Sequence, residues 1–309
     1  MSSPVRFMSF SSGSCGNCYY FECGGQAVLI DAGASIRSIK KAMVANGLSL
    51  DAVSAVLVTH DHLDHIRNLG SFCKRLNRPV YASAQLHKAL EHHTFTAPHI
   101  GGCRRILEAG KWNPVGSMLV RFFEVPHDAS HTCGFAIAAE DRKFFIMTDA
   151  GRVTDEAVSL ASQADVVVIE SNYDVDMLMG GPYPHELKMR ICGGNGHLSN
   201  DECASAITRF WHPGLKAIFL CHLSENNNTH EAAYACSHAA LEAVGAPVPG
   251  KAPVCRTPSR ALKPGSPKNG TFLGVSDGGG TTLQTGAFSG TPVLLRPLPR
   301  EYPSPLFNL

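Results

Sequence analysis

Short apolar segments separated by polar turns dominate roughly the first half of the chain. Hydrophobic side chains at alternate positions, or in short unbroken runs, indicate β-strands. Glycine-rich turns at residues 12–14 and 24–25 separate the first three of these segments. The pattern predicts strands at residues 5–10, 18–23, 26–30, 55–58, 79–82, 118–125, 133–139 and 143–148.

Helical periodicity is more frequent in the second half, where strands and helices alternate. Two further apolar runs, residues 165–169 and 217–221, predict buried strands. The pattern predicts helices at residues 35–47, 64–77, 84–92, 154–163, 198–210 and 229–244. Hairpins followed by alternating strands and helices fit two packed sheets with helices outside them. We therefore expect a mixed α+β and α/β protein, a four-layer αββα sandwich.

The composition changes at about Gly245. Residues 246–290 are dense in Pro, Gly, Ser and Thr and have almost no apolar periodicity, which predicts a flexible segment. Residues 291–309 form a C-terminal tail, with an apolar stretch that would suit an edge strand. The main folded domain is expected over residues 1–245.

Charge and cysteine content limit the classes of protein to which the chain can belong. The formal net charge is +1, so nucleic-acid binding would require a local basic patch. The eleven cysteines are dispersed, and no apolar leader is visible at the start, which predicts reduced thiols in the cytoplasm. No apolar run approaches the ~20 residues that span a bilayer, so no membrane association is expected. The oligomeric state is left open.

Histidines and aspartates concentrate directly after the predicted strand 55–58, at His60, His62, Asp64 and His65. Residues two apart in an extended backbone project to the same side, so His60 and His62 can reach one point. Asp64 and His65 can face a second point nearby. Imidazole and carboxylate groups suit Zn²⁺ or Mn²⁺. A solvated loop would account for one histidine, whereas this spacing predicts two divalent metal ions.

The H-x-H-x-D-H string resembles that of the metallo-β-lactamase superfamily, and the resemblance implies further ligands after later strands. His127 would complete the first metal site, Asp149 would bridge the two metals, and His222 would complete the second site. Asp31 would orient a ligand histidine. The metallo-β-lactamase fold is then expected over residues 1–245, as the catalytic domain.

Two alternatives to these ligands remain open in the sequence. His131 lies four residues after His127, although His127 is closer to its strand. Cys221 directly precedes His222 and would be either a ligand or a small buried residue. The Cys15-x-x-Cys18 pair favours a structural interpretation, because no second pair accompanies it.

Further strings are similar to those of the YycJ/WalJ family. They are S-G-S-x-G-N ending at Asn17, E-S-N from Glu170, G-P-Y-P from Gly181, G-H-L-S-N from Gly196 and H-L-S-x-x-N-N from His222. Tyr173 stands where that family usually has histidine. The resemblance implies a metal-dependent 5′→3′ exonuclease that acts on DNA in preference to RNA and is linked to repair.

The residues themselves indicate a phosphodiesterase. Two carboxylates, Asp64 and Asp149, suit a phosphoester substrate, with a hydroxide that bridges two metals as the nucleophile. Asp64 and His197 are the candidate catalytic residues, and His197 would protonate the leaving group. The candidate substrate-binding residues are Asn172, Ser199 and Asn200. A helix-capping turn is the alternative for residues 197–200.

Two further questions stay open in the sequence: the role of the basic residues and the class of hydrolase. Arg67, Lys74, Arg75 and Arg78 are close in sequence to the metal string, and Lys188 and Arg190 lie on a predicted basic segment. Each group would either contact the nucleic-acid backbone or form a solvated face. The alternative activities are those of a ribonuclease, or of a thioester or lactone hydrolase with the same metals. A binding protein without activity would be expected to lack some of the ligands.

Overall fold

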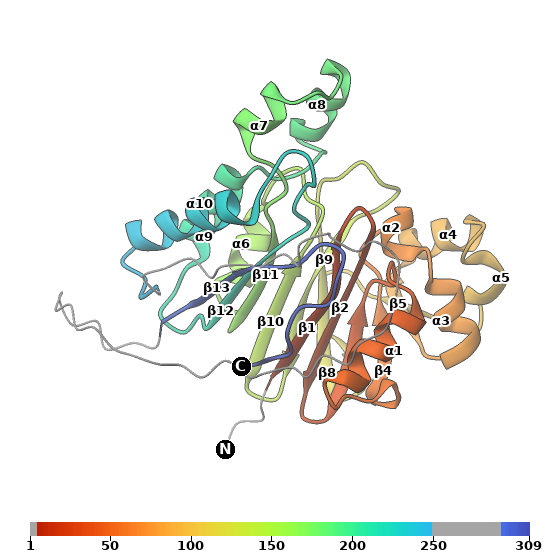
Figure 1. Cartoon of the computed structure of the whole chain (residues 1–309). Coiled ribbons are helices and arrows are strands. Elements are labelled where there is room, and N and C mark those ends of the chain that lie inside the picture. Colours follow the sequence, from red (N-terminus) through yellow and green to blue (C-terminus); the bar gives the residue numbers. More distant parts are fainter. Residues whose placement is uncertain (1–4, 249–291) are drawn as a thin grey trace, which may run out of the picture.

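The computed structural model describes residues 5–248 and 292–309. Two seven-stranded sheets lie face to face, and helices cover the outer face of each (Figure 1). The predicted αββα sandwich is confirmed. No helix in the described ranges is long and apolar enough to cross a membrane.

The first sheet combines an antiparallel meander with parallel strands. Its order is β14-β1-β2-β3-β4-β5-β6. β1, β2 and β3 are antiparallel, and β3 to β6 run parallel. The bounds are β1 (Arg6–Gly13), β2 (Gly16–Cys23), β3 (Gln26–Ile30), β4 (Val53–Leu57), β5 (Val80–Ser83), β6 (Arg104–Leu107) and β14 (Phe307–Asn308).

The second sheet has a similar composition of antiparallel and parallel strands. Its order is β13-β12-β11-β10-β9-β8-β7, and β10 to β13 are parallel. The bounds are β7 (Asn113–Val115), β8 (Met118–Glu124), β9 (Cys133–Ala139), β10 (Arg142–Met147), β11 (Val166–Glu170), β12 (Ala217–Cys221) and β13 (Leu294–Pro297).

The helices form the two outer layers and one projection. Those on the first sheet are α1 (Ile36–Ala45), α2 (Leu63–Ile66), α3 (Leu69–Leu76), α4 (Ala84–His92) and α5 (Ala97–Ile100). Those on the second sheet are α6 (Asp155–Ala161), α9 (Asn200–Phe210) and α10 (His230–Ala243). The remaining two, α7 (Val175–Gly180) and α8 (His185–Cys192), project beyond one end of the sheets (Figure 1). We call α7 and α8 the arm.

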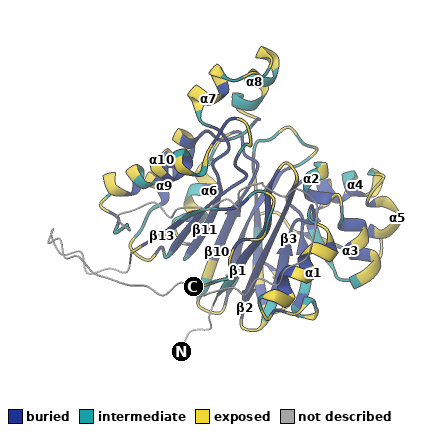
Figure 2. Cartoon of the chain, in the orientation of Figure 1, coloured by how far each residue is buried: buried dark blue, intermediate teal, exposed yellow. Residues whose placement is uncertain are grey.

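Both faces of the central strands of each sheet are buried, which explains the unbroken apolar runs in the sequence (Figure 2). Phe7, Tyr19 and Phe21 pack between the sheets, whereas Met8 and Tyr20 pack under the helices of the first sheet. Successive side chains of a strand point to opposite faces, so neighbours in sequence enter different apolar layers.

The helix predicted at residues 64–77 is wrong as a single element, because α2 and α3 are separate. The backbone N–H of Asn68 donates to Ala32 O, and its side chain donates to Gly33 O. These bonds tie the junction to the loop after β3 and interrupt the helix.

The C-terminal residues 292–309 supply an edge strand to each sheet. β13 pairs in parallel with β12, and β14 pairs antiparallel with β1. The sequence suggested one edge strand in this tail and gave no sign of the second. Most of the segment predicted to be flexible, residues 249–290, lies outside the described ranges.

Candidate metal centre

The carboxyl ends of five strands meet at one end of the sandwich, and a polar residue stands at or just after each. Asp31 follows β3, His60 lies three residues after β4, Asp149 two after β10, Glu170 ends β11 and His222 follows β12. All five are buried. Asp31 and His222 have φ of 62° and 52°, a left-handed conformation that few non-glycine residues adopt. Such strain commonly marks a functional site.

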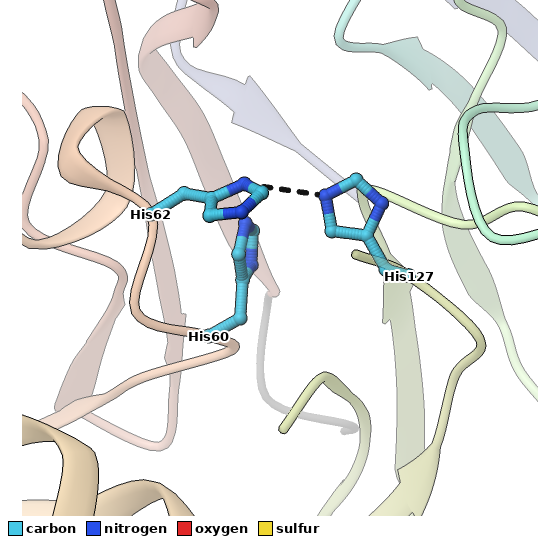
Figure 3. Close-up of side chains that lie close together, drawn as sticks. All are labelled: His60, His62 and His127. Carbon is cyan, nitrogen blue, oxygen red and sulfur yellow. Dashed lines mark hydrogen bonds between the residues drawn. The ribbon is translucent and has the colours of Figure 1, made fainter. Parts of the chain in front are cut away.

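Three histidines form the first ligand group, His60, His62 and His127 (Figure 3). Their ligand nitrogens lie within 4.8 Å of one another, and His62 Nδ1 is 3.3 Å from His127 Nε2. The second ring nitrogen of His62 donates to the carbonyl of Asp128 (3.1 Å), and that of His127 donates to the carbonyl of Gly196 (2.8 Å). These carbonyls fix the tautomers, so the facing nitrogens carry free lone pairs.

Asp64, His65 and His222 form a second group, again with ligand atoms within 4.8 Å of one another. Asp149 lies between the two groups. Its Oδ2 is 3.2 Å from His65 Nε2 and its Oδ1 is 3.3 Å from His222 Nδ1, while it also clusters with His60. The seven side chains named from the sequence therefore surround two adjacent points that share one carboxylate.

Three buried atoms of this cluster lack a hydrogen-bond partner within the described residues: His60 Nε2, Asp149 Oδ2 and His222 Nε2. Burying a polar atom unpaired costs about 1–3 kcal/mol. Divalent cations would satisfy these lone pairs, and five imidazoles with two carboxylates are a donor set that suits Zn²⁺ or Mn²⁺. The residues present therefore fit two metal ions.

Asp31 and Asn17 form hydrogen bonds to side chains of the second group. Asp31 accepts hydrogen bonds from Thr59 N and Oγ1, both at 2.8 Å, and from His65 Nδ1 at 2.7 Å. This leaves His65 Nε2 directed at the ligand group. Asn17 Nδ2 lies 2.8 Å from that nitrogen and 3.1 Å from Asp64 Oδ2. Asn17 was visible in the sequence only as part of a family string.

Glu170 entered the sequence analysis only as the start of a family string and was assigned no role there. Its Oε1 accepts hydrogen bonds from His197 Nδ1 (2.8 Å) and His222 Nδ1 (2.9 Å). Its Oε2 accepts from the backbone N–H groups of Ala150 (2.9 Å) and Leu198 (3.1 Å). The available signal was its position, because it ends an apolar strand as the other site residues follow theirs.

The field of the carboxylates favours positive charge at the centre of the cluster. Burial lowers the pKa of His65, but Asp149 and Asp31 outweigh it and raise that pKa well above its usual value. Burial opposes a positive His222 as well, yet Asp149 and neighbouring acceptors raise its pKa to about 10. Burial raises the pKa of Asp149, but His222 and His65 bring it well below the ordinary range. Such a site attracts cations.

The three residues proposed from the sequence to bind substrate have different environments. Asn172 lines the cleft above the metal ligands, and its Nδ2 donates to His222 O (2.7 Å). Ser199 instead caps α9 in a reciprocal capping box with Glu202. Asn200 is buried and bonds other buried polar side chains. Ser199 and Asn200 therefore make structural contacts in this fold, and their contact with substrate stays a prediction.

The alternative ligands lie outside the cluster. His131 Nδ1 is 2.9 Å from Ser83 Oγ, and His131 belongs to none of the ligand groups found in the described residues. Cys221 is fully buried, and its thiol faces Met147 O at 3.9 Å. Tyr173 is buried as well and forms a β-bridge with Ser199, away from the ligand groups.

Four of the seven candidate ligands line a cleft of about 330 Å³, namely His62, Asp64, Asp149 and His222, and residues of the arm form one wall. Arg190 on α8 reaches down to Asp128, beside the first ligand group, with both Nε and a terminal nitrogen 2.5 Å from Oδ2. Lys188 donates to Met179 O and Gly181 O at 2.7 Å, so it stabilises the end of α7 and is not free for substrate. The residues lining the cleft include Ser14, His62, Asp64, Asp149, Asn172, Tyr183, Leu187, Arg190, His197, His222 and Asn226.

Comparison with known proteins agrees with this geometry. The family model described as a beta-lactamase superfamily domain matches residues 26–219. Exodeoxyribonuclease WalJ of Streptococcus pneumoniae serotype 2 is 33% identical over 229 residues, which cover 74% of this chain and 85% of the relative. Exodeoxyribonuclease YycJ of Bacillus anthracis is 34% identical over 241 residues, 78% of this chain and 90% of the relative.

The fold comparison points the same way. The metallo-beta-lactamase fold protein YhfI of Bacillus subtilis superposes with a TM-score of 0.59 at 16% identity, over 77% of this chain and 93% of that structure. At this identity the likeness concerns the fold alone. The ligand strings, the sandwich and the two curated relatives agree, and the chain belongs to the metallo-β-lactamase superfamily, within its group of YycJ/WalJ-like proteins.

Proposed function

We propose that this chain is a metal-dependent phosphodiesterase that degrades DNA as a 5′→3′ exonuclease. The observation that carries the proposal is the pair of ligand groups sharing Asp149 at the floor of an open cleft. The names of the two curated relatives, both exodeoxyribonucleases, support DNA as the substrate. A role in DNA repair follows from the same resemblance. The described cysteines are free thiols, which suits the reducing cytoplasm.

Two divalent cations, zinc or manganese, would occupy the two groups. Bound there, they would acidify water and neutralise charge on a phosphoryl group. The ligands we assign are His60, His62 and His127 for the first ion, Asp64, His65 and His222 for the second, and Asp149 for both. Asp31 would keep His65 in the required tautomer.

His197 is the proposed proton donor to the leaving oxygen. Its Nδ1 donates to Glu170, so its Nε2 is the nitrogen available to the cleft, which the ring lines. Burial lowers the pKa of His197, but the Glu170 carboxylate outweighs burial and raises it. A raised pKa increases the protonated fraction of the imidazole at a given pH, which favours its use as a general acid.

The cleft walls offer groups that suit a nucleotide. Asn172 presents an amide beside His222, and Arg190 carries a guanidinium suited to phosphate. Tyr183 OH accepts a hydrogen bond from Asn226 Nδ2 (2.9 Å), which joins the arm to the loop after β12. The Tyr183 ring would provide a surface on which a base can stack.

The test is hydrolysis of end-labelled duplex DNA, single-stranded DNA and RNA after chelation and readdition of Mn²⁺ or Zn²⁺. We expect stepwise shortening of DNA from a 5′ end, abolished in His62→Ala and retained in the control His92→Ala, which alters an exposed histidine of α4. Cleavage of RNA alone would change the substrate to RNA. Turnover of a thioester or lactone without polymer cleavage would overturn the nuclease proposal.

A further inference from the structure

Charge is distributed unequally between the two outer layers of the sandwich. α1 and α3, on the first sheet, carry five basic residues and no acidic ones. α6, α9 and α10, on the second sheet, carry six acidic residues and one arginine. The net charge of +1 therefore conceals a basic side and an acidic side. A concentrated basic face beside an active site attracts polyanions.

A second hollow, of about 730 Å³, lies on the basic side, and we call it the basic groove. One face of α1 lines it, including Ser38 and Lys41, and Arg67 lines it from the residue after α2. Lys41 and Arg67 are exposed. Glu301 from the C-terminal tail is the acidic residue in the lining, and Tyr302 adds an aromatic ring.

The basic groove adjoins the metal-site cleft across a single turn. Ser14 and Cys15 are consecutive exposed residues at the tip of the β1–β2 hairpin. Ser14 lines the cleft, whereas Cys15 lines the basic groove. Consecutive Cα atoms are about 3.8 Å apart, so a strand leaving the cleft passes into the groove over one residue. Arg67 Nη1 donates to Cys15 O (3.5 Å), which places its guanidinium at this crossing.

We propose that the basic groove binds the phosphodiester backbone of the DNA beyond the nucleotides held in the cleft, with Lys41 and Arg67 contacting phosphates. The inference rests on the proposed nuclease function and adds a binding site to it. The cleft, of about 330 Å³, is smaller than the groove and has room only for a short terminal portion of a strand. The remainder of a long substrate therefore needs a second surface, and the basic groove adjoins the cleft and carries two exposed basic residues, Lys41 and Arg67, against one acidic residue, Glu301.

The experiment compares Lys41→Ala/Arg67→Ala with the control Lys143→Ala/Arg209→Ala, which removes the same charges from the second-sheet side. Binding of a fluorescent phosphorothioate DNA strand, which resists cleavage, is measured against salt concentration in the Mn²⁺-loaded proteins. Loss of two phosphate contacts on a single strand reduces the slope of log K against log salt by about 1.4. The control slope should equal that of the wild type.

A second readout is the dependence of kcat/KM on substrate length. In the wild type, kcat/KM should rise from a dinucleotide to a long strand, and the Lys41/Arg67 variant should lose most of that rise. Lys41→Gln alone, a change on an exposed helix surface, should lower the salt slope by about 0.7. Thermal melting checks that each variant is folded.

An unchanged slope in both Lys41 variants would overturn the basic groove as a DNA site, and so would an equal loss in the control. These results concern a wild type that binds and cleaves DNA. A wild type that neither binds nor cleaves DNA would instead refute the proposed function.

Discussion

The buried carboxylate of Glu170 accepts hydrogen bonds from two histidines, and this arrangement affects the pH dependence of activity. If His197 donates a proton, activity falls as the pH rises through the pKa of His197, which Glu170 raises. Glu170→Gln removes that charge and lowers this pKa, so the alkaline limb of kcat/KM should move to lower pH. Glu202→Gln, which alters the capping box of α9, is the control and should leave the limb in place. An unmoved limb in Glu170→Gln would contradict the role of His197.

Asp31 accepts a hydrogen bond from the candidate ligand His65, although it is not itself in a ligand group of the described residues, and we expect it to act on the metal centre through that ring. In Asp31→Asn, the negative charge that orients the ring and strengthens its basicity is lost. Metal affinity should fall by about 10–100-fold, since that is the usual cost of changing such a partner. Titration with a competing chelator measures it, and Asp51→Asn, on the surface, is the control. Equal affinities in Asp31→Asn and the wild type would show that His65 needs no support.

The site residues were predictable from sequence to different extents. Four of them lie in one short segment, and their spacing alone indicates that their side chains can reach two neighbouring points: His60, His62, Asp64 and His65. Glu170 has no such spacing, because its partners His197 and His222 are distant in sequence and meet it only in the folded chain. For Ser199 the sequence left two roles open, because a capping serine and a phosphate-binding serine both precede a helix, and the structure shows the capping contact.

At the scale of elements, the regular layers were predictable and the short pieces were not. Strands buried on both faces read as apolar runs, so most bounds came within a few residues. α8 buries none of its residues, so it has no apolar periodicity. β6 has an exposed centre, and β14 is only two residues long. Such elements are stabilised by contacts with neighbouring elements, and the local sequence pattern does not show those contacts.

The arm is tied to the metal centre by Arg190, whose partner Asp128 follows the ligand His127 and accepts from His62. Arg190→Ala should lower kcat/KM for DNA roughly tenfold, since hydrogen bonds to charged groups contribute about 1.5–3 kcal/mol. The guanidinium is exposed, so thermal stability should change little. Arg209→Ala, which breaks a similar exposed pair with Asp155, is the control. An unchanged kcat/KM in Arg190→Ala would show that this contact of the arm does not contribute to catalysis.

For the whole molecule, the ligands join both sheets, so metal binding should stabilise the entire sandwich. A ligand at 100 times its Kd adds about 2.7 kcal/mol to the free energy of unfolding. For a chain of this size, that corresponds to a rise in Tm of about 4 °C. Calorimetry of chelated and Mn²⁺- or Zn²⁺-reloaded protein measures the shift. His62→Ala should show a smaller rise, and an unchanged wild-type Tm would exclude a metal site that bridges the sheets.

The placement of β13 and β14 has a consequence for biosynthesis. Residues 292–309 leave the ribosome after every strand with which they pair, so β1 and β12 each keep an open edge until then. Open edges recruit other strands and promote aggregation. One outermost pairing of each sheet is therefore made after the rest of the sandwich has been synthesised. A product of premature termination that lacks these residues would expose two unpaired strand edges at once and would be prone to aggregate.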